Sequence, residues 1–210
     1  VATAVFQRGR DIWVVFNNES RIDTLRLRTI LPTAVLNVTR YRLPGNTVLK
    51  LETDGKVNAQ VEAGKGSYAW TVRLVPGVTS AIKDTPIQSN AAHSRPHLMF
   101  QVFDLGNPFS FYDPAIGDRW LVAPTFEAGL GIGNPRRFPE FEVVPSVQGI
   151  AVLTQRPDIE LERTRSGLKL SGEKGLDISR DLPFLSGSSA PIKGASTSNV
   201  LLPYDQWYID

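Results

Sequence analysis

Apolar residues recur along this chain in short runs, and several of the runs alternate with polar residues at every second position. Residues 12–16 form the strongest run. A turn sequence around Gly9 comes before them, and residues 1–6 come before that turn. β-branched and aromatic residues of this kind fit a pleated, half-buried surface. The pattern predicts a hairpin over residues 1–16 with Gly9 in its turn.

Residues 47–76 show the same pattern more regularly. Residues 48–52 alternate apolar and charged side chains, and residues 57–61 alternate again after Asp54-Gly55. An Asp-Gly pair is typical of a two-residue type I′ turn, because both turn positions favour positive φ. We therefore predict three consecutive antiparallel strands, the third with one face formed by Tyr68, Trp70, Val72 and Leu74.

A central stretch, residues 98–154, contains at least four further apolar runs separated by turn-forming clusters. Residues 113–118 and 145–149 combine proline with a later glycine, a combination that favours turns. Trp120–Val122 and Ile150–Leu153 follow these turns as strands. A last hairpin is expected around Ser166-Gly167, between residues 159–163 and 168–170.

Other segments are less regular. Residues 21–43 allow a short helix or a strand with a loop, and the alternation of Arg26, Leu27 and Arg28 favours the strand. Residues 186–199 consist mainly of small and polar residues and have no periodicity, which is typical of a linker.

These patterns predict an all-β fold with little helix and an extended C-terminal tail. The strands are expected to form an antiparallel β-sandwich or two packed β-meander modules. The expected division is a first module over residues 1–80, a connector over 81–97, a second module over 98–175 and a tail or linker over 176–210.

Composition restricts the possible function. The 210 residues carry a formal net charge of +2 and no basic cluster, so we expect no nucleic-acid partner. The absence of cysteine excludes disulfides, thiolate metal sites and cysteine nucleophiles, and it fits an exported bacterial protein. No apolar run is long enough to cross a membrane. Because the chain begins with Val1, we expect that a leader or an upstream region is missing from it.

The sequence contains only weak signals for a catalytic or cofactor-binding site. His93 and His97 are four residues apart, but Pro96 argues against a helix that would align them for a metal. Residues 129–133 are glycine-rich, yet a strand rather than a helix is expected after them, which favours a flexible hairpin loop over a phosphate site. Six carboxylates could include a glycosidase-like pair, although nothing fixes their separation: Asp104, Asp113, Asp118, Glu127, Glu140 and Glu142. We therefore predict no enzyme activity, cofactor or metal.

Three tryptophans, Trp13, Trp70 and Trp120, each lie near the start of an expected strand after a turn. Ordinary β-meander repetition explains this loose similarity, and a duplicated β module is the alternative. Exposed tryptophans could stack on sugar rings, whereas their apolar surroundings favour burial in the core.

Residues 4–16, 112–124 and 148–152 resemble the β-rich N-terminal region of large exported proteobacterial proteins that carry tetratricopeptide repeats downstream. The meanders are also distantly similar to AMIN-type β modules, which bind cell wall or assemble with envelope machinery. This resemblance implies a periplasmic location and a scaffolding role, and it brings no catalytic residues.

The resulting hypothesis is a non-enzymatic periplasmic interaction module within a larger cell-envelope assembly. Its expected partners are other envelope proteins or other domains of the same chain, with peptidoglycan as a further candidate. The alternative is a carbohydrate- or peptidoglycan-binding module that uses exposed aromatic residues. The predicted partner-binding residues are Tyr204, Trp207, Tyr208, Arg136 and Arg137.

Overall fold

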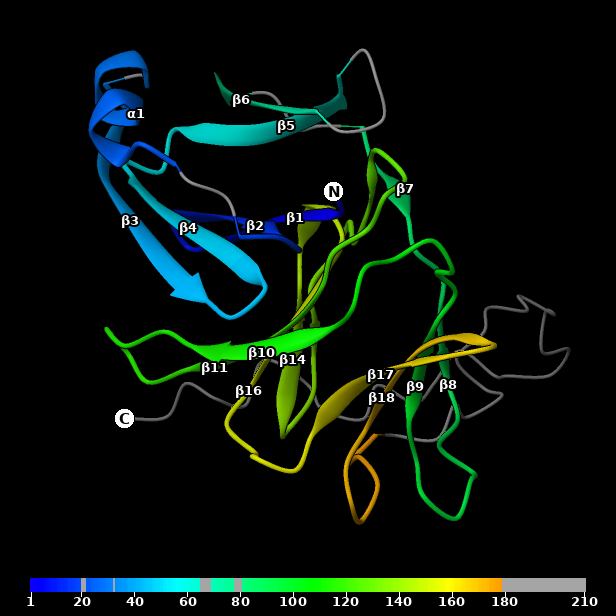
Figure 1. The fold of residues 1–210 in the computed structure, drawn as a ribbon. Helices are drawn as coiled ribbons and strands as arrows, with labels where there is room; N and C mark the ends of the chain where they lie inside the picture. The colour runs from blue at the N-terminus through cyan, green and yellow to red at the C-terminus, as the bar shows by residue number, and fades with distance from the viewer. Residues whose placement is uncertain (20–21, 32, 65–68, 78–80, 179–210) are drawn as a thin grey trace, which may run out of the picture. The chain divides into compact units, whose positions relative to one another are not determined.

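A computed structural model describes residues 1–19, 22–31, 33–64, 69–77 and 81–178. These residues belong to one compact unit that spans residues 1–180 (Figure 1). They form β-strands and one short helix, and almost all strand pairs are antiparallel. The predicted all-β fold with little helix is therefore confirmed.

The first sheet contains the N-terminal hairpin. Its members are β1 (Thr3–Arg8), β2 (Asp11–Phe16), β3 (Val35–Leu43), β4 (Asn46–Thr53) and β15 (Ser146–Gln148). They lie in the order β15-β1-β2-β4-β3, and all neighbours pair antiparallel. The predicted hairpin over residues 1–16 is confirmed, and Gly9 takes a φ of +59° in its turn.

The second sheet comes from the central stretch. Its members are β10 (Phe109–Tyr112), β11 (Arg119–Ala123), β13 (Arg136–Arg137), β14 (Phe141–Val144) and β16 (Ile150–Thr154). They lie in the order β10-β11-β16-β14-β13, again antiparallel. The strands predicted at Trp120–Val122 and Ile150–Leu153 are therefore present.

An apolar layer joins the first and second sheets as in a β-sandwich. Alternate residues of β1, β2 and β11 point into it, because side chains alternate between the two faces of a strand. Trp13 of the first sheet and Trp120 of the second meet there, with ring centroids 5.7 Å apart. The buried members of this inter-sheet layer are Ala4, Phe6, Trp13, Val15, Val48, Phe111, Trp120, Val122, Val144 and Ala151.

Both sheets are also covered on their outer faces. The second sheet packs against a third sheet that contains β8 (Ile87–Ser89), β9 (Leu98–Phe100), β17 (Glu160–Thr164) and β18 (Gly167–Ser171). The first sheet packs against α1 (Thr24–Ile30) and the pair β5 (Val57–Ala63) and β6 (Trp70–Pro76). A parallel pair, β7 (Lys83–Asp84) and β12 (Leu130–Gly131), completes the set. The predicted last hairpin is confirmed as β17–β18.

The prediction of three consecutive paired strands over residues 47–76 is wrong at its first turn. β5 pairs with β6, but β4 pairs with β2 and β3. Both hydrogen-bonding edges of β4 are therefore occupied, and the chain at Asp54-Gly55 leads into another layer instead of closing a hairpin. Gly55 still takes a positive φ of +82°.

The strand preference for Arg26–Arg28 is also wrong, because these residues lie in α1. The Asp23 side chain accepts hydrogen bonds from the backbone N–H groups of Leu25 and Arg26, each at 3.0 Å. An aspartate in this position satisfies N–H groups that a helix end leaves free, and so favours the helix.

Strands of the two predicted modules pair with each other. Residues 145–149, expected as a turn, contain β15, which pairs with β1 and so joins the first sheet. The expected connector 81–97 contains β7 and β8, which pair with β12 and β9. Leu176 and Ile178, at the start of the expected tail, are buried in the core, and the remainder of the tail lies outside the described residues.

Candidate functional site

A lysine lies buried at the border of the inter-sheet layer. Lys50 is on β4 directly opposite Trp13 of β2, and 6% of its surface is exposed. Its Nζ donates to Asp113 Oδ2 at 3.0 Å and lies 3.2 Å from Asp11 Oδ2. Asp113 follows β10, so this ion pair connects the two sheets. We call Lys50, Asp11 and Asp113 the buried triad.

The backbone around Asp113 holds its carboxylate in place. Asp113 is fully buried, and its Oδ1 accepts a hydrogen bond from the Ala115 N–H at 3.0 Å. Its own N–H donates to the Asp118 carbonyl at 2.9 Å, and its carbonyl accepts from the Gly117 N–H at 2.7 Å. The turn predicted over residues 113–118 thus directs one carboxylate oxygen to Lys50 and the other to a backbone N–H.

Aromatic rings surround the triad. The Lys50 Nζ lies over the Trp13 ring at 5.1 Å from its centroid, within the range of a cation–π interaction. Tyr41 of β3 stacks on the same ring at 5.9 Å, and Phe111 of β10 lies against it at 5.7 Å. Lys50 and Asp113 therefore have little contact with solvent, whereas the Asp11 side chain is 24% exposed.

The surroundings shift two pKa values upward. Burial acts to lower the pKa of Lys50, but its hydrogen bonds to Asp113 and Asp11 outweigh burial and raise it above 10.5. Burial, followed by the negative charge of Asp113, raises the pKa of the Tyr41 hydroxyl above 10.0. In the ion-paired state Lys50 is therefore an ammonium and Tyr41 a neutral phenol.

A similar arrangement lies on the other side of the layer. Arg8 forms an ion pair with Asp118, and its guanidinium lies 5.8 Å from the centroid of the Trp120 ring. Asp118 precedes Trp120 by two residues, as Asp11 precedes Trp13. The loose sequence similarity between these segments thus corresponds to two aspartate–cation–tryptophan groups that meet in one layer.

The two indole N–H groups in this layer are unusual. Trp13 and Trp120 are 1% and 0% exposed, and within the described part of the chain neither Nε1 has a hydrogen-bond acceptor. An unpaired buried donor costs about 1–3 kcal/mol. Both tryptophans therefore contribute to stability through the packing of their rings rather than through hydrogen bonds of their N–H groups.

A second charged cluster fastens residues 173–178 to the domain. Arg156 pairs with Glu140 and Asp158. The Asp177 N–H donates at 2.9 Å to Glu140 Oε2, the oxygen that Arg156 does not contact, and the Glu173 N–H donates at 3.1 Å to Asp158 Oδ2, which also accepts from Arg156. The Arg156 hydrogen bond holds the pKa of Asp158 below 3.8. We call Arg156, Glu140 and Asp158 the Arg156 cluster, and its role is structural, since the guanidinium and both carboxylates are engaged in hydrogen bonds.

Protonation of its carboxylates at low pH is expected to weaken the Arg156 cluster. A carboxyl group whose pKa is lowered by folding stabilises the protein above its unfolded pKa and loses that effect as pH falls through the folded value. Wild-type protein should therefore be more stable than Asp158→Asn above pH 3.8, and the difference should vanish at lower pH. Thermal unfolding of both proteins at pH values above and below 3.8 measures the difference in stability. Substitution of an exposed carboxylate, Glu160→Gln, is the control. A difference that does not change with pH would contradict the assignment.

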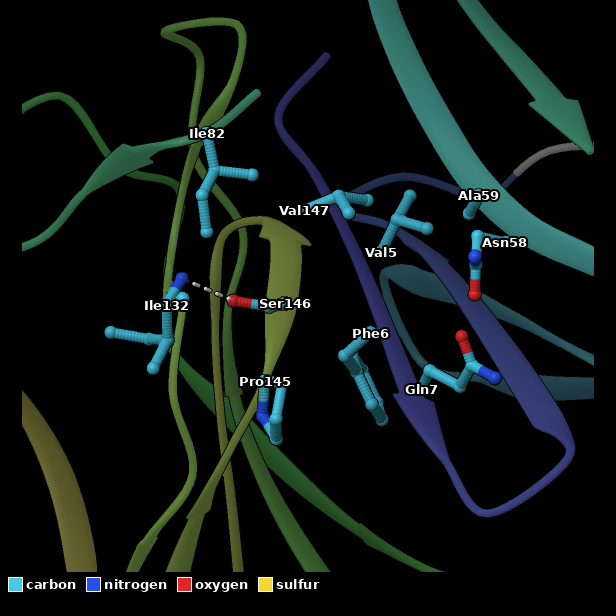
Figure 2. A pocket seen from close by; sticks show the side chains of 11 residues that line it. Val5, Phe6, Gln7, Asn58, Ala59, Ile82, Ile132, Pro145, Ser146 and Val147 are labelled. Atoms are coloured by element: carbon cyan, nitrogen blue, oxygen red, sulfur yellow. Dashed lines mark hydrogen bonds between the residues drawn. The ribbon is translucent and has the colours of Figure 1, made fainter. Parts of the chain in front are cut away.

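A small apolar cleft lies where β1, β5 and β15 approach one another (Figure 2). Its volume is about 150 Å³, and Val5, Ile82, Ile132 and Val147 contribute to its walls. The Ile132 N–H donates to Ser146 Oγ at 3.0 Å beside it. Among the described residues that line it, none is ionisable, so the cleft offers no acid–base chemistry.

The predicted partner-binding residues are only partly described. Arg136 and Arg137 are exposed on β13 at one edge of the second sheet, and Arg137 Nε donates to Glu142 Oε1 at 3.1 Å. Tyr204, Trp207 and Tyr208 lie outside the described residues. The role of all five in binding stays a prediction.

The other candidate groups have local roles. His93 and His97 lie edge to face at 5.1 Å, and both ring Nδ1 atoms lie within 3.2 Å of the Arg95 carbonyl. No group of three or more metal-ligating side chains occurs within the described ranges. Gly131, expected in a flexible loop, lies in β12, and a Cβ there would be 2.1 Å from the Ser146 carbonyl oxygen.

The six carboxylates considered for catalysis do not converge on one another. Five of them pair with basic side chains from other parts of the chain: Asp113 with Lys50, Asp118 with Arg8, Glu127 with Lys83, Glu140 with Arg156 and Glu142 with Arg137. Turn formation alone does not account for Asp113 and Asp118, because both also form inter-sheet ion pairs.

Comparison of the chain with protein-family models, curated proteins and solved structures gives no match. Within the described residues, no helix has the length and apolar character needed to cross a membrane. The function must therefore be argued from the chain's own geometry.

Sequence reasoning missed the buried triad. The alternation of residues 48–52 suggested that Lys50 faced solvent, whereas both faces of β4 are covered. No signal in the local sequence distinguishes Lys50 from a solvent-facing lysine, because the layer that covers it comes from the second sheet.

Proposed function

We propose that this chain is a non-enzymatic structural and interaction module of a periplasmic assembly, and that it docks a protein partner on an apolar patch formed by α1 and the start of β3. We assign to it Leu25 and Ile30 of α1 and Leu36 of β3, the strand that α1 contacts, with 74%, 69% and 62% of their surfaces exposed. The single observation that carries the proposal is this group of three large, exposed aliphatic side chains on adjoining elements. Exposed apolar groups of this kind mark interaction surfaces.

The local structure explains why these residues face outward. Leu36 is the extra residue of a β-bulge, because Val35 pairs with Thr53 and Asn37 with Glu52. A bulge redirects side chains at a sheet edge. Arg28 fixes α1 against β3 by donating to Asn37 Oδ1 at 2.6 Å and to the Val38 carbonyl. The patch is therefore held on a defined framework (Figure 1).

The charge around the patch specifies the partner's chemistry. Arg26 and Arg28 are exposed on α1, and the helix contains no acidic residue. A complementary surface would combine aliphatic side chains with carboxylates, since matched charges guide association. We therefore commit to a protein segment with apolar and acidic residues as the occupant.

The positions of the tryptophans favour a protein over a glycan. Trp13 and Trp120 are buried, and Trp70 is half-buried with its Nε1 donating to the Val1 carbonyl at 2.7 Å. The rings of Trp13 and Trp120 are therefore not accessible to a sugar. The absence of cysteine and the resemblance to exported proteobacterial β modules support the periplasmic location.

Site-specific photocrosslinking in cells tests this docking. A photoreactive residue at Leu36 should give a discrete protein adduct, whereas one at Ile116, which is 61% exposed on another loop, should not. Arg26→Glu should reduce the Leu36 adduct several-fold, because it reverses the charge without removing a side-chain contact described for Arg26. An adduct of equal yield from Ile116, or one that Arg26→Glu leaves unchanged, would contradict the proposal.

A further inference from the structure

The buried triad contains the groups needed to form a covalent bond. Lys50 Nζ lies 3.0 Å from Asp113 Oδ2, and a second carboxylate, Asp11, lies 3.2 Å from the same nitrogen. We propose that Lys50 Nζ and the Asp113 side-chain carboxyl carbon condense to an amide, which joins β4 to the turn after β10 across the two sheets. The triad is thus a self-modification site, and no separate enzyme is needed.

The geometry holds the nucleophile beside the carboxyl group that it attacks. A nucleophile held at hydrogen-bond distance from a carboxyl group reacts as if at very high concentration, because its approach entropy is already lost. Negative charge develops on Asp113 Oδ1 during the attack, and this oxygen accepts the Ala115 N–H at 3.0 Å. A fixed backbone donor on that oxygen stabilises the tetrahedral intermediate.

Asp11 completes the proton transfers. One proton moves from the Lys50 ammonium to Asp113 Oδ2, which leaves a neutral amine and a carboxylic acid. The nitrogen lone pair attacks the carbon, and a second proton passes through Asp11 Oδ2 to the departing Oδ2. The C–N bond forms first, and the tetrahedral intermediate then collapses with cleavage of the C–O bond. The products are one secondary amide, which keeps the third proton, and one water molecule.

Burial provides the driving force. Two charges held away from water are costly even when paired. The amide is neutral, so condensation removes both charges from the aromatic surroundings of Trp13, Phe111 and Tyr41. The favoured ammonium form of Lys50 makes the neutral pair a minor population, so the reaction is expected to follow folding slowly.

An exposed pair in the same chain provides an internal comparison. Lys83 pairs with Glu127, but their side chains are 67% and 45% exposed. Water surrounds this pair and competes for both groups, so no condensation is expected there. The proposal therefore depends on burial and on the second carboxylate, Asp11, not on the presence of a lysine–carboxylate contact.

The experiment is an intact-mass measurement on the full 210-residue chain after folding and denaturation. We expect a mass lower than that of the sequence by one water molecule, and a peptide digest in which the segments holding Lys50 and Asp113 are joined. The crosslink would close a loop between positions 63 residues apart, so the denatured chain should also migrate faster in a denaturing gel. The full sequence mass with both peptides separate would overturn the proposal.

Variants locate the bond and separate chemistry from folding. Lys50→Arg keeps a cation but cannot condense in this way, so it should keep its full mass while remaining folded by circular dichroism. Asp113→Asn should lose ammonia instead of water, and Asp11→Asn should slow the mass change several-fold. Loss of water from folded Lys50→Arg would contradict the assignment to Lys50.

Discussion

Replacement of Lys50 by alanine is expected to lower the free energy of unfolding by about 3–5 kcal/mol, because breaking a buried ion pair leaves its partner uncompensated. The partner here is Asp113, which is fully buried and lies 3.0 Å from the lysine nitrogen. Loss of the lysine leaves a carboxylate with one backbone donor, Ala115, and no cation from β4. Urea unfolding of protein whose intact mass shows Lys50 and Asp113 not yet condensed measures the change.

The matched control is Lys83→Ala. Lys83 also pairs with a carboxylate, Glu127, but on the surface, where an ion pair contributes about 0–1 kcal/mol. The two substitutions remove the same side chain, so their difference isolates the effect of burial. A loss at Lys50 no larger than at Lys83 would contradict the role of the buried triad in joining the sheets.

Replacement of Trp120 by alanine is expected to cost about 3–5 kcal/mol, the range for removing a large aromatic side chain from a core. The side chain is fully buried, and it contacts Trp13 at 5.7 Å and Phe6 at 4.9 Å between ring centroids. Its removal would leave a cavity at the centre of the layer that holds the sheets together. Thermal or urea unfolding again provides the measurement.

Two further variants serve as controls for Trp120→Ala. Trp120→Phe retains an aromatic ring and removes an indole N–H that has no acceptor in the described part of the chain, so it should cost clearly less than alanine. Tyr112→Ala removes an aromatic residue that is 59% exposed on the neighbouring strand, and it should change stability little. Equal losses at Tyr112 and Trp120 would be inconsistent with an inter-sheet core.

Local pattern predicted much of the fold. The hairpin at Gly9, the strand at Trp120 and the last hairpin at Gly167 are where period-two alternation and turn residues place them. The partner of β4 could not be predicted in this way, because a favourable Asp-Gly turn says nothing about whether the strand's edges are already occupied. The helix was under-weighted because the capping aspartate, Asp23, is a shorter signal than the alternation after it.

Predicting the candidate sites requires the tertiary structure to a greater degree than predicting the strands does. Lys50 and Asp113 are 63 residues apart, and neither lies in a motif. Their contact follows from the stacking of two sheets, which alternation along one strand cannot specify. The patch at Leu25, Ile30 and Leu36 was hidden for a related reason, since an apolar run predicts burial until the neighbouring layers are known.

Sedimentation with cell envelopes tests the central claim, that the α1–β3 patch binds a protein. The purified chain should pellet with envelopes that retain their proteins, and not with sacculi stripped of protein. Leu36→Glu, which adds a negative charge at an exposed position beside α1, should abolish pelleting with the former while the protein stays folded. Equal pelleting of wild type and Leu36→Glu, or pelleting of the wild type with protein-free sacculi, would contradict the account.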